Sequence, residues 1–114
     1  MKTNKLLLFI LLVLLPMIAI AHPPKKVTLS YEKETGLLTI AAMHPVKDVN
    51  DHYIITLEVT VNGETVKTAE YKSQTSPESQ DKTIELPDLA TGDEVTVKAA
   101  CNKFGSKTQS LTIE

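Results

Sequence analysis

The chain has 114 residues, a formal net charge of −2 and a single cysteine. This length supports one domain, and a single cysteine cannot form a disulfide within the chain. Arginine and tryptophan are both absent, which argues against a nucleic-acid-binding or anionic-membrane-binding surface and against an extended aromatic platform.

Residues 1–21 have the build of a secretory signal peptide. A basic start precedes an almost unbroken apolar run from Leu6 to Ile20, and the segment ends in Ala19-Ile20-Ala21, a small-x-small cleavage signature. The apolar run is short for a membrane span. We therefore expect cleavage after Ala21, a secreted or periplasmic protein, and no transmembrane anchor after cleavage.

The mature chain is then expected to be one domain over residues 22–114. Loss of Lys2 and Lys5 with the signal peptide leaves ten basic residues against fourteen acidic ones, a net charge of about −4. Small secreted domains are usually stabilised by disulfides, so the unpaired Cys101 needs another explanation. A buried thiol acting as a small hydrophobic group and a metal ligand are both open.

The first half of the mature chain predicts three strands. Lys26–Glu32 alternates apolar and polar residues, and Leu37–Ala42 is mostly apolar. An irregular loop, Met43–Asp51, precedes the longest predicted strand, His52–Val61. In that strand, the residues expected to share one face are Ile55, Leu57, Val59 and Val61.

The second half predicts four more strands. Asn62-Gly63 favours a two-residue type I′ hairpin turn, in which both residues have positive φ. A strand over Glu64–Lys72 and a polar loop over Ser73–Gln80 follow, and the last strands are expected over Lys82–Leu86, Glu94–Cys101 and Lys107–Ile113. About seven short strands without helical periodicity predict an all-β fold, specifically an immunoglobulin-like antiparallel β-sandwich.

Three histidines and the cysteine are the candidate metal ligands. His22 would be the new N-terminus, His44 and His52 bound the irregular loop, and Cys101 ends the sixth predicted strand. Imidazole and thiolate ligands suit iron, zinc or copper rather than calcium or magnesium. No CxxC or HExxH pattern is present, so isolated surface histidines are the alternative.

Two segments are similar to the superoxide reductase family (desulfoferrodoxin, neelaredoxin). Met43-His44-Pro45-Val46, followed by His52-Tyr53-Ile54, resembles the family's histidine loop, and Val95 to Gly105 resembles its closing strand, which ends in Cys-Asn-x-His-Gly. The resemblance spans most of residues 22–114. It implies an immunoglobulin-like sandwich holding one iron ion with four equatorial histidines and an axial cysteine thiolate. The implied activity is reduction of superoxide to hydrogen peroxide.

When the family's metal ligands are transferred to the matching motifs of this chain, the resemblance implies that His44 and His52 are the loop ligands. It also implies that Cys101 is the axial thiolate and His22 the first ligand. Phe104 stands where the family has a histidine, so at most three imidazoles are available; we expect this side chain to cover the end of the sandwich. The loop is two residues longer than in the family. The family's superoxide-guiding lysine has no motif-matched counterpart, and Lys47 is the candidate substitute.

Three hypotheses stay open. The first is a metal-binding domain with superoxide reductase-type oxidoreductase activity, whose partners are superoxide and an unidentified electron donor. The second is a non-enzymatic immunoglobulin-like binding module without a metal. The third is a copper carrier that uses the amine and ring of His22, since copper heads the divalent affinity order. Asp48 and Asp51 either orient an imidazole or are solvated, and the oligomeric state is left open.

Overall fold

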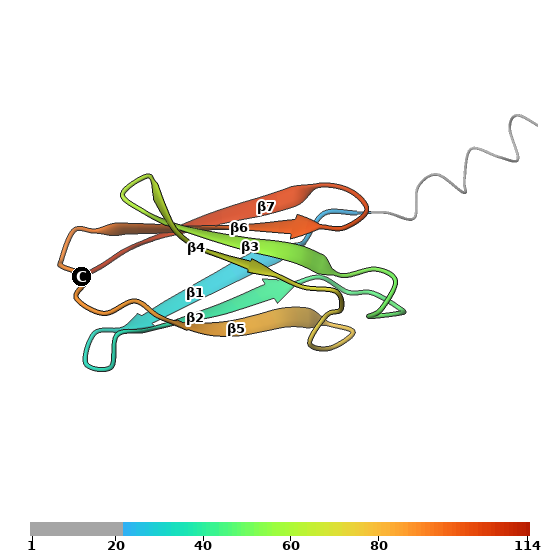
Figure 1. The fold of residues 1–114 in the computed structure, drawn as a ribbon, viewed down its shortest axis with the longest axis horizontal. Helices are drawn as coiled ribbons and strands as arrows, with labels where there is room; N and C mark the ends of the chain where they lie inside the picture. The colour runs from blue at the N-terminus through green and yellow to red at the C-terminus, as the bar shows by residue number, and fades with distance from the viewer. Residues whose placement is uncertain (1–21) are drawn as a thin grey trace, which may run out of the picture.

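The computed structural model describes residues 22–114, and the predicted signal peptide, residues 1–21, lies outside the described residues. Within the described part, seven strands form two antiparallel sheets that pack face to face (Figure 1). The strands are β1 (Lys26–Glu32), β2 (Leu37–Met43), β3 (Ile54–Val61), β4 (Glu64–Glu70), β5 (Ser79–Glu85), β6 (Glu94–Cys101) and β7 (Ser106–Thr112).

The sheets contain three and four strands, in the orders β1-β2-β5 and β4-β3-β6-β7. All five strand pairs are antiparallel. The predicted all-β antiparallel sandwich is therefore confirmed, and its assignment to the immunoglobulin type stays a prediction. In residues 22–114, no helix has the length and apolar character needed to cross a bilayer.

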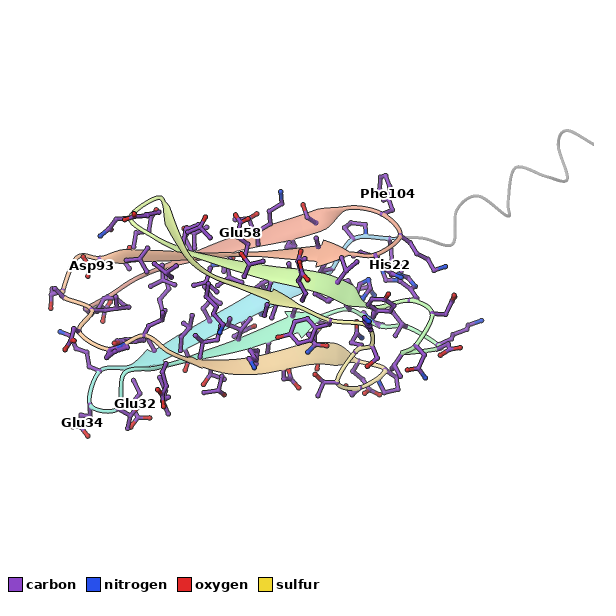
Figure 2. All side chains as sticks on the ribbon, in the orientation of Figure 1. His22, Glu32, Glu34, Glu58, Asp93 and Phe104 are labelled. Atoms are coloured by element: carbon purple, nitrogen blue, oxygen red, sulfur yellow. The ribbon has the colours of Figure 1, made fainter. Side chains whose placement is uncertain are left out.

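The core consists of the inward-facing residues of the two sheets, as strand periodicity requires. Successive residues of a strand point to opposite faces, so every second side chain of β2 and β6 is buried. The buried apolar residues are Val27, Leu38, Ile40, Ala42, Ile54, Leu57, Val59, Ile84, Val95, Val97, Ala99 and Ile113. Figure 2 shows side chains in the space between the two sheets.

The alternation predicted for β3 is wrong at its start. Ile54 is fully buried, whereas Ile55 is 38% exposed. The pairing of β3 with β6 shifts register between Ile54 and Thr56, and such a bulge adds one residue to one strand and reverses which side chains face inward. Leu57 and Val59 keep the predicted inward face.

Several other strand boundaries differ from the prediction by one to three residues. The ordered part of β3 begins at Ile54 rather than His52, which leaves His52 on the loop, and β5 begins at Ser79 rather than Lys82. Ser79 pairs with Met43 at the end of β2. The first residues of β5, Ser79 and Gln80, are polar and so gave no apolar signal for a strand, although Gln80 is buried.

The hairpin between β3 and β4 is confirmed. Asn62 and Gly63 have φ angles of 51° and 84°, as a type I′ turn requires. This turn lies at the end of the sandwich opposite His22 (Figures 1 and 2). The end near His22 contains the last residues of β2, β4 and β6 and the first residues of β1, β3, β5 and β7.

Candidate metal centre

Strand periodicity places His44 and Cys101 between the sheets at the same end of the sandwich. His44 lies two residues beyond the buried Ala42 of β2, and Cys101 lies two residues beyond the buried Ala99 of β6. Both side chains therefore continue the inward face of their strands. His44 is fully buried and Cys101 is 8% exposed.

The loop between β2 and β3 brings His52 back to this end. Its last turn is closed by the backbone N–H of His52, which donates to the carbonyl of Asp48 at 2.9 Å. Asn102 holds the following residue, because Tyr53 N–H donates to Asn102 Oδ1 at 3.0 Å and Asn102 N–H donates to the Tyr53 carbonyl at 3.0 Å. His52 is thus fixed beside the end of β6.

The segment before β1 brings His22 to the same place. Lys25 N–H donates to the Met43 carbonyl at 2.8 Å, which ties this segment to β2. Pro23 packs closely on Gly105 in the β6–β7 turn, where a Cβ atom would meet Pro23 Cβ at 2.7 Å. The contact with Gly105 therefore sets how near His22 can lie to the other two histidines.

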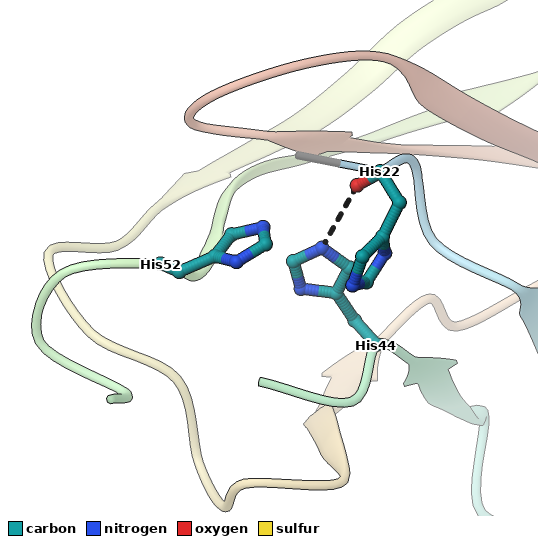
Figure 3. Close-up of side chains that lie close together, drawn as sticks. All are labelled: His22, His44 and His52. Carbon is teal, nitrogen blue, oxygen red and sulfur yellow. Dashed lines mark hydrogen bonds between the residues drawn. The ribbon is translucent and has the colours of Figure 1, made fainter. Parts of the chain in front are cut away.

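The three imidazoles form one cluster (Figure 3). One nitrogen from each of His22, His44 and His52 lies within 4.8 Å of the other two. The ring centroids are 5.1 Å apart for His22–His44 and His22–His52, and 4.7 Å apart for His44–His52. These three histidines lie close enough together to bind one metal ion.

Cys101 contacts the cluster through His52. Its Sγ atom lies 3.1 Å from His52 Nε2, within hydrogen-bonding distance. Lys103 N–H donates to the same sulfur at 3.4 Å. The sulfur therefore faces an imidazole and a backbone donor, not only aliphatic neighbours.

A buried glutamine holds His44. His44 Nδ1 lies 2.8 Å from Gln74 Oε1, and its other nitrogen, Nε2, lies 3.3 Å from the carbonyl oxygen of His22. Sequence reasoning missed Gln74, because a glutamine in a polar loop gives no sign of being buried. A bond of this kind on one ring nitrogen orients the imidazole and leaves the other nitrogen for an ion.

The electrostatic surroundings favour a neutral His52. Burial lowers its pKa from 6.5, and the positive charges that His44, His22 and Lys103 would carry lower it further; Asp51 acts in the opposite direction. A neutral imidazole is the form that binds a metal ion. The surroundings of His52 therefore favour the form of this ring that can bind a cation.

The donor distances fit a transition metal. With metal–sulfur and metal–nitrogen bonds of about 2.3 and about 2.1 Å, the 3.1 Å between Cys101 Sγ and His52 Nε2 corresponds to a ligand–metal–ligand angle of about 90°. Two nitrogens on opposite sides of one ion would lie about 4.2 Å apart. Two nitrogens at a right angle to each other would lie about 3.0 Å apart, so a pair at the 4.8 Å limit of the cluster would have to close by about 0.6 Å if opposite and by about 1.8 Å if adjacent.

The predicted lysine and aspartates of the β2–β3 loop make no hydrogen bond to an imidazole within residues 22–114. Lys47 is exposed on the β2–β3 loop. Asp48 Oδ1 accepts from Asn50 N–H at 2.9 Å, and Asp51 pairs with Lys103 at 3.3 Å, so in the described chain Gln74, not an aspartate, contacts an imidazole. The expected cover by Phe104 is wrong, because its side chain is 63% exposed and projects from the β6–β7 turn into solvent (Figure 2).

No family model, curated protein or solved structure matches the chain. The resemblance to the superoxide reductase family therefore stays a prediction, which depends on the two segments around His44 and Cys101.

Proposed function

We propose that residues 22–114 hold one iron ion in a site of the superoxide reductase type and reduce superoxide to hydrogen peroxide. Two observations carry the proposal: one nitrogen from each of His22, His44 and His52 lies within 4.8 Å of the other two, and Cys101 Sγ lies 3.1 Å from Nε2 of His52. The choice of iron and of superoxide follows from the resemblance of the segments that contain His44, His52 and Cys101.

In this proposal each residue has a defined role. His22, His44 and His52 supply neutral nitrogen donors, and Cys101 supplies a thiolate after its proton is displaced. The backbone N–H of Lys103 donates to that sulfur and stabilises its negative charge. Bound iron would supply one electron that, with two protons, converts superoxide to hydrogen peroxide, and an external one-electron donor would return the iron to the ferrous state.

The proposal includes export of the protein. The support is the basic start, the apolar run and the small-residue signature of residues 1–21. Expression of the full chain in a host with a secretory pathway should yield an exported product whose N-terminal residue is His22. Retention of residues 1–21 on the exported product would contradict this part of the proposal.

The direct test is metal loading of the protein that begins at His22 with no tag before it. We expect one iron per chain after anaerobic loading with ferrous iron, and a thiolate-to-iron absorption band after oxidation. Cys101→Ser should abolish the band. Ala99→Ser is the matched control, because it places the same hydroxyl on the same buried face of β6 and leaves the thiol in place.

The outcomes separate the proposal from its alternatives. An unchanged band and iron content in Cys101→Ser would eliminate the thiolate-iron site. A freely titrating thiol with no bound metal would favour a non-enzymatic module, and exclusive binding of copper in a manner that requires a free His22 amine would favour a copper carrier. Superoxide consumption by the iron-loaded protein, lost in Cys101→Ser, completes the test.

A further inference from the structure

Gln74 is a buried polar residue at the centre of the loops that form the site. It lies between β4 and β5, and only 5% of its surface is exposed. Its backbone N–H donates to the Val49 carbonyl at 3.1 Å, and its side-chain oxygen accepts from Ile54 N–H at 3.2 Å. Gln74 thus contacts the β2–β3 loop in its middle and at its end.

The surroundings of Gln74 fix the orientation of its amide. Nε2 lies 2.7 Å from the His44 carbonyl and 2.9 Å from the Ser76 carbonyl. Carbonyl oxygens only accept hydrogen bonds, so the atom facing them is the NH₂ group. The other amide atom, which receives the Ile54 N–H, is therefore the oxygen.

This orientation determines the proton position on His44. Gln74 Oε1 is an acceptor and lies 2.8 Å from His44 Nδ1, so Nδ1 carries the proton of the neutral ring. Nε2 then has a free electron pair. Its neighbour is the carbonyl oxygen of His22, also an acceptor, at 3.3 Å (Figure 3); because this contact is longer than the 2.8 Å contact of Nδ1 with Gln74, the single proton of the neutral ring is favoured on Nδ1.

We propose that Gln74 is the positioning residue of the metal centre: it holds His44 in the Nδ1–H tautomer and thereby directs Nε2 at the ion. The use of Nε2 as a ligand rests on the proposed function, whereas the tautomer is a property of the metal-free protein. A second contact supports the role, since Gln74 donates to the carbonyl of the same histidine. Backbone and ring of His44 are thus both held by one side chain.

The first experiment needs no metal. Nitrogen-15 NMR of the metal-free protein, with the His44 signals assigned, should show a protonated Nδ1 and an unprotonated Nε2 at a pH where the ring is neutral. A predominant Nε2–H tautomer would overturn the proposal. This readout stands even when the wild-type protein binds no metal, so its outcome is separate from that of the proposed function.

The second experiment uses Gln74→Leu and the matched variant Gln80→Leu. Gln80 is equally buried, at 4% exposure, and its Oε1 accepts from Thr75 N–H at 3.0 Å, in the same loop. Gln80 makes no hydrogen bond to a histidine among the described residues. Both variants lose a buried glutamine, but only Gln74→Leu removes the partner of His44 Nδ1.

Affinity for Co²⁺ alone, measured by competition with a chelator, should fall about 10- to 100-fold in Gln74→Leu and by much less in Gln80→Leu. The His44 tautomer should become mixed only in Gln74→Leu. Equal losses of affinity in the two variants, or an unchanged tautomer in Gln74→Leu, would overturn the positioning role. Thermal unfolding of both variants measures the purely structural cost of losing each glutamine.

Discussion

At the residue scale, the site depends on side chains that fix the histidines as much as on the histidines themselves. His22 is placed by the close packing of Pro23 on Gly105, and His44 by its bond to Gln74. His52 follows a loop turn that Asn102 secures through Tyr53. None of these supporting residues is chemically reactive, which is why a search for catalytic residue types does not find them.

Gly105→Ala should disturb the site as well as the fold. Gly105 has a φ of +81°, and its new methyl would lie 2.7 Å from Pro23 Cβ. The backbone strain costs about 1–2 kcal/mol, and the clash pushes the segment of His22 away from the cluster. We expect at least a severalfold weaker Co²⁺ affinity, measured by chelator competition.

Gly63→Ala is the control for Gly105→Ala. Gly63 has a similar φ of +84° but open space around its Cβ position, and it lies in the turn at the far end of the sandwich. Its variant should lose similar stability to urea while it keeps the wild-type metal affinity. Equal affinity losses in the two variants would show that Pro23 does not position His22.

Lys103 is the lysine whose charge acts on the cluster, since it helps to lower the pKa of His52. In the iron-loaded protein, Lys103→Gln should slow the second-order reaction with superoxide severalfold at low ionic strength, because one attractive charge near the site is lost. Lys47→Gln removes the same charge from an exposed loop position. Stopped-flow or pulse-radiolysis rates measured at several salt concentrations check this, and a larger effect of Lys47→Gln would instead favour Lys47, the lysine suggested by the sequence.

At the element scale, the sequence predicted the strands themselves but missed a bulge in β3 and the direction of one turn. Strands over Leu37–Ala42 and Glu94–Cys101 were predicted, and in the structure every second residue of each is buried on a face that leads to His44 and to Cys101. The bulge near Ile55 lies in an apolar run, so the sequence pattern did not reveal it. The prediction therefore chose Ile55 rather than Ile54 as the buried residue at the start of β3. The exposure of Phe104 depends on how the β6–β7 turn projects, which composition does not encode.

At the far end of the sandwich, Asp93 and Asn62 form a small hydrogen-bond network. Its carboxylate accepts from Ala90 N–H at 2.8 Å and from Asn62 Nδ2 at 3.0 Å. Glu94 N–H in turn donates to Asn62 Oδ1 at 2.9 Å. These hydrogen bonds link the β3–β4 hairpin turn to the start of β6, so that the two elements keep their register.

Asp93 should make the free energy of unfolding depend on pH in the acid range. The bond from Ala90 and then that from Asn62 lower the pKa of this carboxyl. Because the pKa is lower in the folded protein, the contribution of the ionised Asp93 to the free energy of unfolding is complete above the unfolded-state pKa of about 3.9. This contribution is lost as the pH falls through the folded-state pKa. The difference in urea midpoint between wild type and Asp93→Asn should therefore be constant near neutral pH and shrink below about pH 4.

Asp88→Asn provides the control for this pH dependence. It removes the same charge from the same β5–β6 connection, where the described structure shows no hydrogen bond to the Asp88 carboxylate. The difference between wild type and Asp88→Asn should show no comparable acid-dependent shrinkage. If the two variants showed the same pH dependence of the urea midpoint relative to wild type, the role of the Asp93 hydrogen bonds would be contradicted.

At the scale of the whole molecule, the candidate site joins distant parts of the chain. His22 precedes β1, His44 and His52 flank the loop between the sheets, and Cys101 ends β6. Antiparallel strand topology brings these segments to one end, and this much follows from the strand order. The separations between the ring nitrogens depend on loop geometry, and the sequence alone did not predict them.

A bound ion should therefore stabilise the whole domain. An ion that binds only the folded state adds about 2.7 kcal/mol when its free concentration is one hundred times its Kd, and chelation should reverse the increase in Tm. His22→Ala tests the coupling, since His22 is only half-buried and its loss leaves the core intact. The metal-free Tm should stay close to that of the wild type, while the metal-induced increase should become smaller; an undiminished increase would exclude His22 as a ligand.

The most direct measurement is X-ray absorption spectroscopy of the iron-loaded protein that begins at His22. The account predicts one sulfur neighbour at the metal together with imidazole nitrogens, and loss of the sulfur signal in Cys101→Ser but not in Ala99→Ser. A metal environment of nitrogen and oxygen alone in the wild-type protein would contradict it.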